Sequence, residues 1–373
     1  ANLGISKIKL FFNFALPISR PALAASITLV IMETLADFGV VSYLGINTLS
    51  VGIYKAWFSF DDLHSSARLS VVLLIFTLSI ILVEKYLRRN KKENYTSLGQ
   101  YTDVNSLFNS KITLPTCFLF LVILLSFIIP IYWLIANVSL QSFNGLTIVF
   151  YAALNSFKVA FIGAFTIISL AVFIIFTKRI FKINILSFII NFSKIGYAAP
   201  GIVIAIGVIS PSIFFDKQIN HFFSYFGKDT GLILSGSIAI LIFAYLVRFL
   251  SVAFNPIESG LEKISEKIDY SALNLGANKK TLLFKIHLPL IISSCLIAFL
   301  LIFIDILKEL PITLILRPFN YNTLSVLTFE YASSEQLAQA ALPALLITII
   351  GLLPLIFLNK ILNYKEGKTN EYN

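Results

Sequence analysis

Charged residues are scarce in this chain of 373 residues, at 13%, whereas an average soluble domain has about a quarter. Hydrophobic residues make up 57% of the chain, and the mean hydropathy is +0.87. Several apolar runs are long enough to cross a bilayer, so a soluble enzyme, a disordered protein and a fibrous protein are excluded. The net charge of +10 is therefore interpreted as membrane topology, and no nucleic-acid partner is predicted.

Residues that build disulfides, metal sites and catalytic centres are few as well. The two cysteines, Cys117 and Cys295, lie in separate apolar runs and are interpreted as small core residues. The three histidines, His64, His221 and His287, are scattered along the chain, which predicts neither a metal cluster nor a catalytic triad. His287 is assigned to the end of a cytoplasmic loop described below.

A nucleotide-binding P-loop is missing too. The motif Gly-x-x-x-x-Gly-Lys-Ser/Thr is needed because its backbone amides cradle phosphates. The tail sequence Gly367-Lys368-Thr369 imitates the end of this motif, but Leu362 stands where the first glycine is required. We therefore predict that the chain is not an enzyme, that it binds no cofactor and no certain metal, and that a partner hydrolyses any ATP.

Apolar runs of about 20 residues predict eight transmembrane helices. Of the 29 Lys and Arg residues, 21 fall on one side of the membrane, five on the other and three inside the spans. The positive-inside rule makes the richer side cytoplasmic, with both termini of this chain. The predicted spans lie near residues 22–43, 69–84, 113–136, 156–176, 197–215, 232–254, 290–312 and 341–359.

The sequence contains an internal repeat. The stretches ANLG (1–4) and LP (16–17) return with the same spacing as LNLG (273–276) and LP (288–289). Further along, NTLSV at 47–51 returns at 322–326, an identity that composition does not explain. The offset of 272 between the loops also pairs four carboxylates across the copies, placing Glu33 and Asp37 onto Asp305 and Glu309.

This repeat predicts a tandem duplication in an all-α, polytopic membrane protein. The predicted parts are the end of a first copy (1–84), a basic cytoplasmic linker (85–112), a six-span second copy (113–362) and a tail (363–373). The linker could also touch anionic lipid. The first copy has only two spans and the chain starts at Ala1 without an initiator methionine. We therefore expect the start of the first copy to lie outside this chain, as a truncation, a split gene or a fragment.

The cytoplasmic loop at 255–289 is the most informative segment. Apolar and charged residues alternate in its first part, an Ala-x-x-x-Gly step follows at 272–276, and Leu288-Pro289 begins the next span. Small residues permit close approach of another surface, glycine permits a sharp turn, and proline suits the first turn of a helix. An amphipathic helix lying on the membrane is the alternative. The repetition of the Gly-to-Leu-Pro spacing in the other copy favours a docking function over this alternative.

The loop resembles the "EAA" coupling loop of permeases in binding-protein-dependent ABC importers, in which a short helix docks on the ATPase. Over almost its whole length the chain resembles the ferric-iron type of these permeases, in which two permease halves are fused. The matching stretches are ETLADFG (33–39), GIYKAWF (52–58), GYAAPG (196–201), VRFL (247–250), DILKELP (305–311), LRPFN (316–320) and AALPA (340–344).

The resemblance implies a type I-like helical bundle in a bacterial inner membrane. It also implies two partners, an ATPase homodimer that uses the ATP and an extracytoplasmic substrate-binding protein. One stretch departs from the family, because Tyr270-Ser271-Ala272 replaces Glu-Ala-Ala and the acid is displaced to Asp269. The ATPase contacts implied by the resemblance are Asp269, Ala272, Gly276, Leu288 and Pro289, with a remnant loop at Gly4, Leu16 and Pro17.

Other functions stay open at this point. A gradient-driven secondary transporter or channel also often contains repeats, but both copies here have the same orientation and each has a coupling-type loop. A membrane scaffold would leave the duplicated acids unexplained. Among importers, the coupling loop does not separate ferric iron from thiamine, polyamines, sulfate or phosphonates. Iron is preferred from the family resemblance and the paired carboxylates, since hard cations suit oxygen ligands.

The four carboxylates Glu33, Asp37, Asp305 and Glu309 are candidate residues of the translocation path. Each pair is spaced i, i+4 and is therefore expected on one helix face. A charge near the bilayer centre costs roughly 2.5–3.5 kcal/mol on insertion scales, so these acids are not expected to face lipid. One interpretation is an acidic constriction between the two copies, near the outer side. The other is structural, with Asp305 or Glu309 paired to Lys308 or Arg317.

Overall fold

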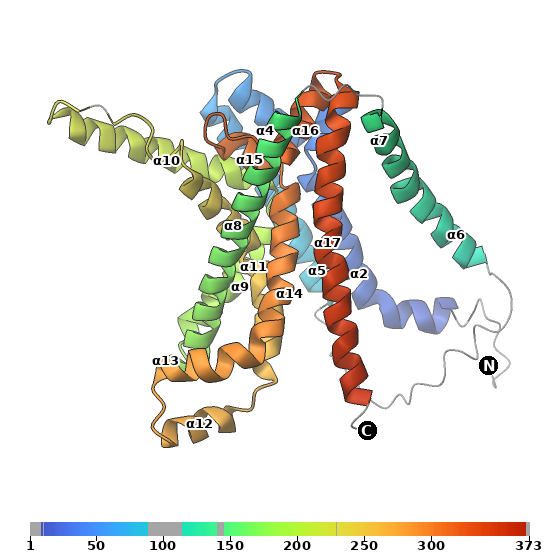
Figure 1. Ribbon diagram of the computed structural model, residues 1–373, viewed down its shortest axis with the longest axis vertical. Coiled ribbons are helices and arrows are strands. Elements are labelled where there is room, and N and C mark those ends of the chain that lie inside the picture. Colours follow the sequence, from blue (N-terminus) through green and yellow to red (C-terminus); the bar gives the residue numbers. More distant parts are fainter. Residues whose placement is uncertain (1–8, 10, 89–113, 140–144, 229, 371–373) are drawn as a thin grey trace.

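The computed structural model describes residue 9 and residues 11–88, 114–139, 145–228 and 230–370, and this part of the chain is helical without a strand (Figure 1). The predicted all-α class is confirmed. Short π-helical turns are η1 (Phe11–Ala15), η3 (Leu124–Ile128) and η4 (Leu282–His287). The helices are α2 (Leu16–Ala36), α3 (Gly39–Tyr43), α4 (Leu49–Phe58), α5 (Leu63–Arg88), α6 (Leu114–Ile123), α7 (Ile129–Ser139), α8 (Leu146–Phe181), α9 (Asn184–Ala198), α10 (Gly201–Ser224), α11 (Ile238–Glu262), α12 (Glu266–Asn274), α13 (Lys279–Thr281), α14 (Leu288–Lys308), α15 (Pro311–Leu316), α16 (Leu324–Ser333) and α17 (Leu337–Asn370).

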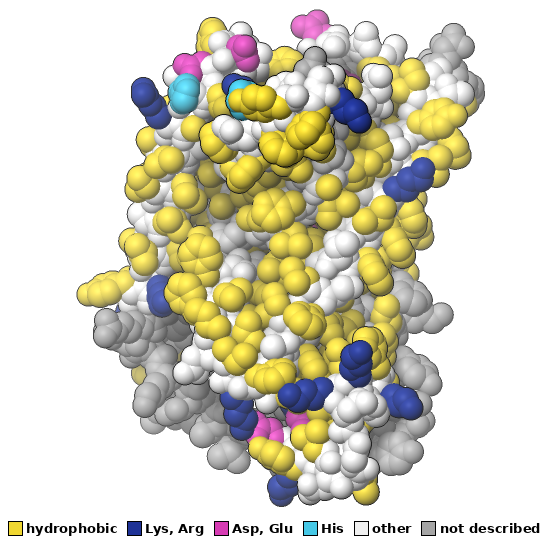
Figure 2. Space-filling model, turned by 90° about the vertical axis from the view of Figure 1, so that its left-hand side faces the viewer, with side chains coloured by type: hydrophobic (Ala, Val, Ile, Leu, Met, Phe, Trp, Pro, Cys, Tyr) yellow, Lys and Arg dark blue, Asp and Glu magenta, His cyan; other side chains and the backbone are white. Residues whose placement is uncertain are grey.

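Eight segments of the described chain are long and apolar enough to span a membrane, in the order that the sequence predicts. Apolar side chains cover the middle of the face shown in Figure 2, and most charged side chains lie toward its two ends. Three predicted boundaries are wrong, because a hydropathy window does not detect helix breaks. The spans predicted at 22–43 and 290–312 end at Ala36 and Lys308, and the one predicted at 197–215 starts at Gly201, after a separate helix α9.

The two copies share their order of elements. A long helix, a break, a short helix, a helix of ten residues and another long helix follow one another in α2–α5 and again in α14–α17. The turns also correspond, since Gly45 and Asn320 have φ of 69° and 60°, and Asp61 and Glu335 have φ of 51° and 61°. L-residues seldom adopt positive φ, so these paired turns point to one inherited backbone path. The domain boundaries at 84, 112 and 362 stay predictions.

The core lies in the second copy, where α11 packs against α8, α9 and α14. Small side chains line these contacts, and six alanines of α8, α11 and α14 have no exposed surface. Small residues let helix backbones approach closely, which is how helices associate when lipid surrounds them. This packing holds α8, α11 and α14 together. Polar side chains lie at two levels of the bundle, one around α12 and one at the break after α14. The six alanines are Ala160, Ala164, Ala171, Ala244, Ala253 and Ala298.

Candidate coupling and gating sites

The loop between α11 and α14 forms a short helix at one end of the bundle. Ser265 caps α12, and its hydroxyl accepts a hydrogen bond from the Lys267 amide. The helix stops before Gly276, whose φ of +83° is left-handed and suits glycine. The chain then turns through α13 and η4 into α14, so the loop projects beyond the bundle (Figure 1).

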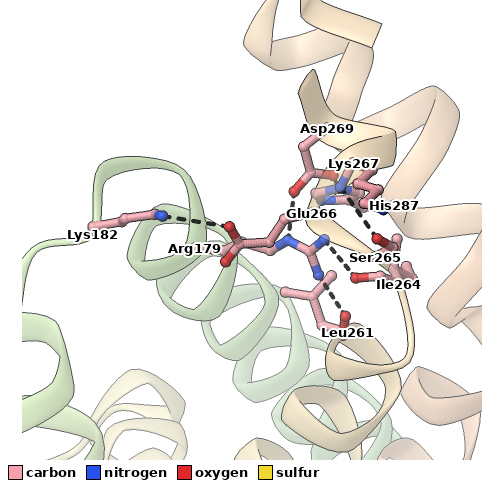
Figure 3. A network of polar contacts seen from close by, with 9 residues as sticks. All are labelled: Arg179, Lys182, Leu261, Ile264, Ser265, Glu266, Lys267, Asp269 and His287. Atoms are coloured by element: carbon pink, nitrogen blue, oxygen red, sulfur yellow. Dashed lines mark hydrogen bonds and ion pairs between the residues drawn. The ribbon is translucent and has the colours of Figure 1, made fainter. Parts of the chain in front are cut away.

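One guanidinium holds this loop to the end of α8 (Figure 3). Arg179 Nε donates to Asp269 Oδ2 at 2.7 Å, Nη1 to the Leu261 carbonyl at 2.5 Å, and Nη2 to the Ile264 carbonyl at 2.8 Å. Leu261 lies in the last turn of α11, where carbonyls lack helical partners. Arg179 therefore connects α8 to the end of α11, to the following turn and to α12.

The second oxygen of Asp269 is bound by a buried histidine. His287 Nε2 lies 2.7 Å from Asp269 Oδ1, and the His287 side chain is completely buried. Its ring also packs edge-on against Phe176 of α8, with ring centroids 5.4 Å apart. Asp269 thus joins α8, through Arg179, to η4 at the start of α14, through His287. We name Arg179, Asp269 and His287 the joint.

Two weaker ion pairs flank the joint. Lys178 Nζ lies 2.9 Å from Glu258 Oε1, and Lys182 Nζ lies 3.5 Å from Glu266 Oε2. The side chains of the second pair are 68% and 62% exposed, against 12% and 10% for Arg179 and Asp269. Exposed pairs contribute about 0–1 kcal/mol, so the joint is the stronger tie.

The predicted coupling residues occupy different positions in this loop. Asp269 and Ala272 are the buried residues of α12, so the Asp269 carboxylate points inward to Arg179 and His287. The outward surface instead has Ile268, Tyr270, Leu273 and Leu275, which are 41–88% exposed. Contact of any of them with a partner stays a prediction. Gly276, Leu288 and Pro289 follow α12, Leu16 and Pro17 begin α2, and Gly4 lies outside the described residues.

The second level of polar side chains lies away from α12, where each copy has a broken helix. Asp37 and Glu309 lie in the breaks, so the expectation that each i, i+4 pair shares one helix face is wrong. Asp37 Oδ1 accepts a hydrogen bond from the Val40 amide at 3.4 Å, and Glu309 Oε1 accepts one from the Ile312 amide at 3.3 Å. Each acid precedes the N-cap of the following short helix and accepts a hydrogen bond from an amide in its first turn, which gives it a structural role.

Glu309 is also part of a buried ion pair. Both of its oxygens lie 2.7 Å from Arg248 Nη1, and the side chains are 7% and 12% exposed. Gly201, at the start of α10, makes room for the pair, because a Cβ there would collide with both charged groups. For Glu309 the structural interpretation thus has the right form but a different partner, Arg248. Asp305 does pair with Lys308, at 2.9 Å, whereas Arg317 pairs with Glu330.

The breaks of the two copies meet at this level. Leu310 lies against Gly39, where an added Cβ would be 3.0 Å from Leu310 Cδ2. Phe38 packs against Phe329, with ring centroids 5.4 Å apart. The Tyr197 hydroxyl donates to Glu33 Oε1 at 3.4 Å, and Asp305 acts electrostatically on the same hydroxyl. One acid from each copy therefore lies near Tyr197.

A hollow of about 930 Å³ lies beyond these breaks, at the end of the bundle away from α12. It is bordered by both copies, with Trp57 and Phe58 from the first and Phe319 and Asn322 from the second. Arg317, held by Glu330 and Asn322, lies at its polar edge.

Sequence reasoning missed Arg179, Arg248 and Tyr197. Arg248 carried a usable signal, since a lone arginine in an apolar span requires a partner. Arg179 carried none, because it looks like an ordinary basic residue at the end of a span, and its partner Asp269 is 90 residues away. Hydropathy and motif spacing do not identify such pairs.

Comparison with curated proteins finds similar importer permeases. The chain is 27% identical over 366 residues to the Fe(3+)-transport system permease protein FbpB 2 of Haemophilus influenzae, covering 96% of this chain and 69% of that protein. It is also 27% identical over 135 residues to the putative 2-aminoethylphosphonate transport system permease protein PhnV of Salmonella choleraesuis, covering 36% of this chain and 51% of that protein. No family model matches the chain. Over almost its whole length the chain is therefore similar to a ferric-iron ABC importer permease, and this similarity and its eight apolar helices support a multi-pass protein of the inner membrane.

Proposed function

We propose that the chain is the permease of an ATP-driven importer of ferric iron. An extracytoplasmic binding protein delivers the cargo, and a separate ATPase supplies the energy. The observation that carries the proposal is the 27% identity over 96% of the chain with an iron-transport permease. The phosphonate permeases match only about a third of the chain, which makes them the weaker guide to its substrate.

The orientation follows from charge. The end of the bundle that bears α12 also carries the lysines and arginines that the positive-inside rule assigns to the cytoplasm. We infer that α12 contacts the ATPase through its exposed apolar face and that the hollow at the opposite end faces the binding protein. The same rule places both termini of this chain in the cytoplasm.

The cargo path would pass the breaks where the copies meet. Asp37 and Glu309 accept hydrogen bonds from the short helices that follow them, and Glu309 is neutralised by the buried Arg248, so they are poor ligands for a passing cation. Glu33 and Asp305 lie near Tyr197, one from each copy, and Asp305 is paired, among the described residues, only with Lys308, whose side chain is 60% exposed. We infer that these oxygens guide a hard cation transiently, because too tight a site would trap the ion.

The test is transport by a reconstituted complex. The chain would be assembled in liposomes with an ATPase and a binding protein from the same organism, and uptake of labelled ferric iron would be measured with and without ATP. We expect ATP- and binding-protein-dependent uptake of iron and none of 2-aminoethylphosphonate. Uptake of the phosphonate alone would reassign the substrate, and uptake driven by an ion gradient without ATP would refute the importer.

A further inference from the structure

We propose that Arg179 positions the coupling helix α12, by making it move together with α8 and α14 through the Asp269 carboxylate. The proposal rests on the proposed function only where it treats α12 as the helix that couples the permease to an ATPase. The structural part concerns how one short helix is held, and is tested without any partner. Arg179 does not belong to the loop motif that indicated coupling, His287 was assigned only to the end of that loop, and Asp269 was expected to contact the ATPase directly.

A helix as short as α12 needs contacts with the rest of the protein to be stable in one position. It has nine residues, whereas isolated helices shorter than about 12–15 residues are marginal in water. Only Asp269 and Ala272 of α12 are buried, so few apolar contacts fix its position. The Ser265 cap stabilises one end but does not determine where the helix lies relative to the bundle. That position must come from the Asp269 and Ala272 contacts.

Asp269 has partners on two sides. Arg179 of α8 binds one carboxylate oxygen and His287 of η4 binds the other, both at 2.7 Å. Ala272 adds an apolar contact in the same place, where it clusters with Phe176 of α8 and Leu282 of η4. The same two membrane-anchored elements therefore hold α12 through its polar residue and through its apolar one.

Arg179 suits this role better than a lysine would. Its planar guanidinium donates in three directions, to Asp269 and to the carbonyls of Leu261 and Ile264. A lysine is a point charge on a flexible stem and does not reproduce this fixed fork. Arg179 thus sets the angle between the end of α11 and α12, besides neutralising Asp269.

Helices α11 and α14 are also joined away from α12, by the ion pair between Arg248 and Glu309. α14 runs from the segment of His287 to Lys308, next to Glu309, and α11 contains Arg248, which binds Glu309. A displacement of α12 would therefore reach helices α11 and α14, which are joined again at the break where the copies meet. This arrangement provides a mechanical connection from α12 to the cargo path.

The experiment combines two measurements on the full chain in lipid nanodiscs. Hydrogen exchange of the α12 amides reports how firmly the helix is held, and the ratio of binding-protein-stimulated to basal ATP hydrolysis in the assembled complex reports coupling. The variants are Asp269→Asn, which removes the charge, and Arg179→Lys, which keeps the charge and loses the fork. Lys182→Gln, at the C-cap of α8, is the matched control because its ion pair is exposed.

We expect α12 in Asp269→Asn to exchange roughly 10- to 100-fold faster, the range for losing a hydrogen bond to a charged group. Arg179→Lys should show a smaller increase, and Lys182→Gln none. The stimulation ratio should fall in the same order. Unchanged exchange in both joint variants would overturn the proposal, and so would faster exchange with an unchanged ratio.

Two further results separate this proposal from the proposed function. If the stimulation is lost in Asp269→Asn while α12 exchanges as in the parent, Asp269 contacts the ATPase directly and the positioning role is wrong. If the parent complex shows no stimulation, the importer function fails, yet the exchange rates still decide whether the joint holds α12. Should Asp269→Asn not insert, Arg179→Lys provides the same comparison.

Discussion

Replacing Glu309 by glutamine should leave Arg248 as a buried charge without its counter-ion. Both carboxylate oxygens lie 2.7 Å from Arg248 Nη1 and both side chains are nearly buried, so water does not replace the lost interaction. Breaking such a pair by removing one partner costs about 3–5 kcal/mol. The insertion cost of an arginine at mid-membrane, roughly 2.5–3.5 kcal/mol, gives a similar figure. We expect Glu309→Gln to lose about 3 kcal/mol of unfolding free energy.

Removing both charges should cost much less. Arg248→Met with Glu309→Gln leaves no unpaired charge, and the glutamine oxygen still reaches the Ile312 amide that the Glu309 carboxylate caps. We expect the double variant to lie within about 1.5 kcal/mol of the parent, since apolar replacement of a whole buried pair is often neutral. The two substitutions would then be strongly non-additive. Lys308→Gln, whose side chain is 60% exposed, is the control and should change little.

The assay can use a thiol already in the chain. Cys295 is buried and Cys117 exposed, so in a Cys117→Ser background a thiol-reactive dye reports unfolding at Cys295. Unfolding free energies would be measured by titration with sodium dodecyl sulfate in mixed micelles. If the losses in the two single variants simply add in the double variant, the Arg248–Glu309 pair does not stabilise the fold as described.

Three further predictions concern glycines and the cargo path. Gly201→Ala should destabilise the chain by about 2–3 kcal/mol in the same dye assay, because its Cβ would collide with Arg248 and Glu309; a loss below 0.5 kcal/mol would contradict this packing. Gly276→Val should cost about 1–2 kcal/mol and lower stimulated ATP hydrolysis, since its φ is +83° with open space around it, whereas Gly276→Asn should be tolerated. Glu33→Gln with Asp305→Asn should lower iron uptake at least about 10-fold while the unfolding free energy changes by less than 1 kcal/mol; normal uptake would show that these acids are structural.

The sequence was sufficient for the elements that depend on local composition. The hydropathy runs predicted eight spans in the right order, and the recurrence of NTLSV and of the Gly-to-Leu-Pro spacing predicted a repeat that is visible as matched elements and turns. These features are local, so a window of residues contains what determines them. The class of helical permease followed from motifs, and the similarity to an iron-transport permease supports it.

The polar ties could not be predicted in the same way. Arg179 and Asp269 are 90 residues apart, and Arg248 and Glu309 are 61 apart, so only the packed fold brings them together. The helix breaks were missed because Asp37 and Glu309 each sit between apolar stretches that a hydropathy window averages into one span. In both breaks the acid accepts a hydrogen bond from the first turn of the next helix, a local interaction that the i, i+4 interpretation overlooked.

The matched left-handed turns record how the two copies have diverged. Glycine at position 45 and asparagine at 320 occupy one backbone conformation, as do aspartate at 61 and glutamate at 335. Asparagine and aspartate tolerate this region better than most residues, whereas glutamate has no such advantage. The residue types at these turns therefore differ between the copies while the backbone conformation is the same, and Glu335 adopts it at some conformational cost. The positive-φ turns therefore mark equivalent positions in the two copies even where the residues differ.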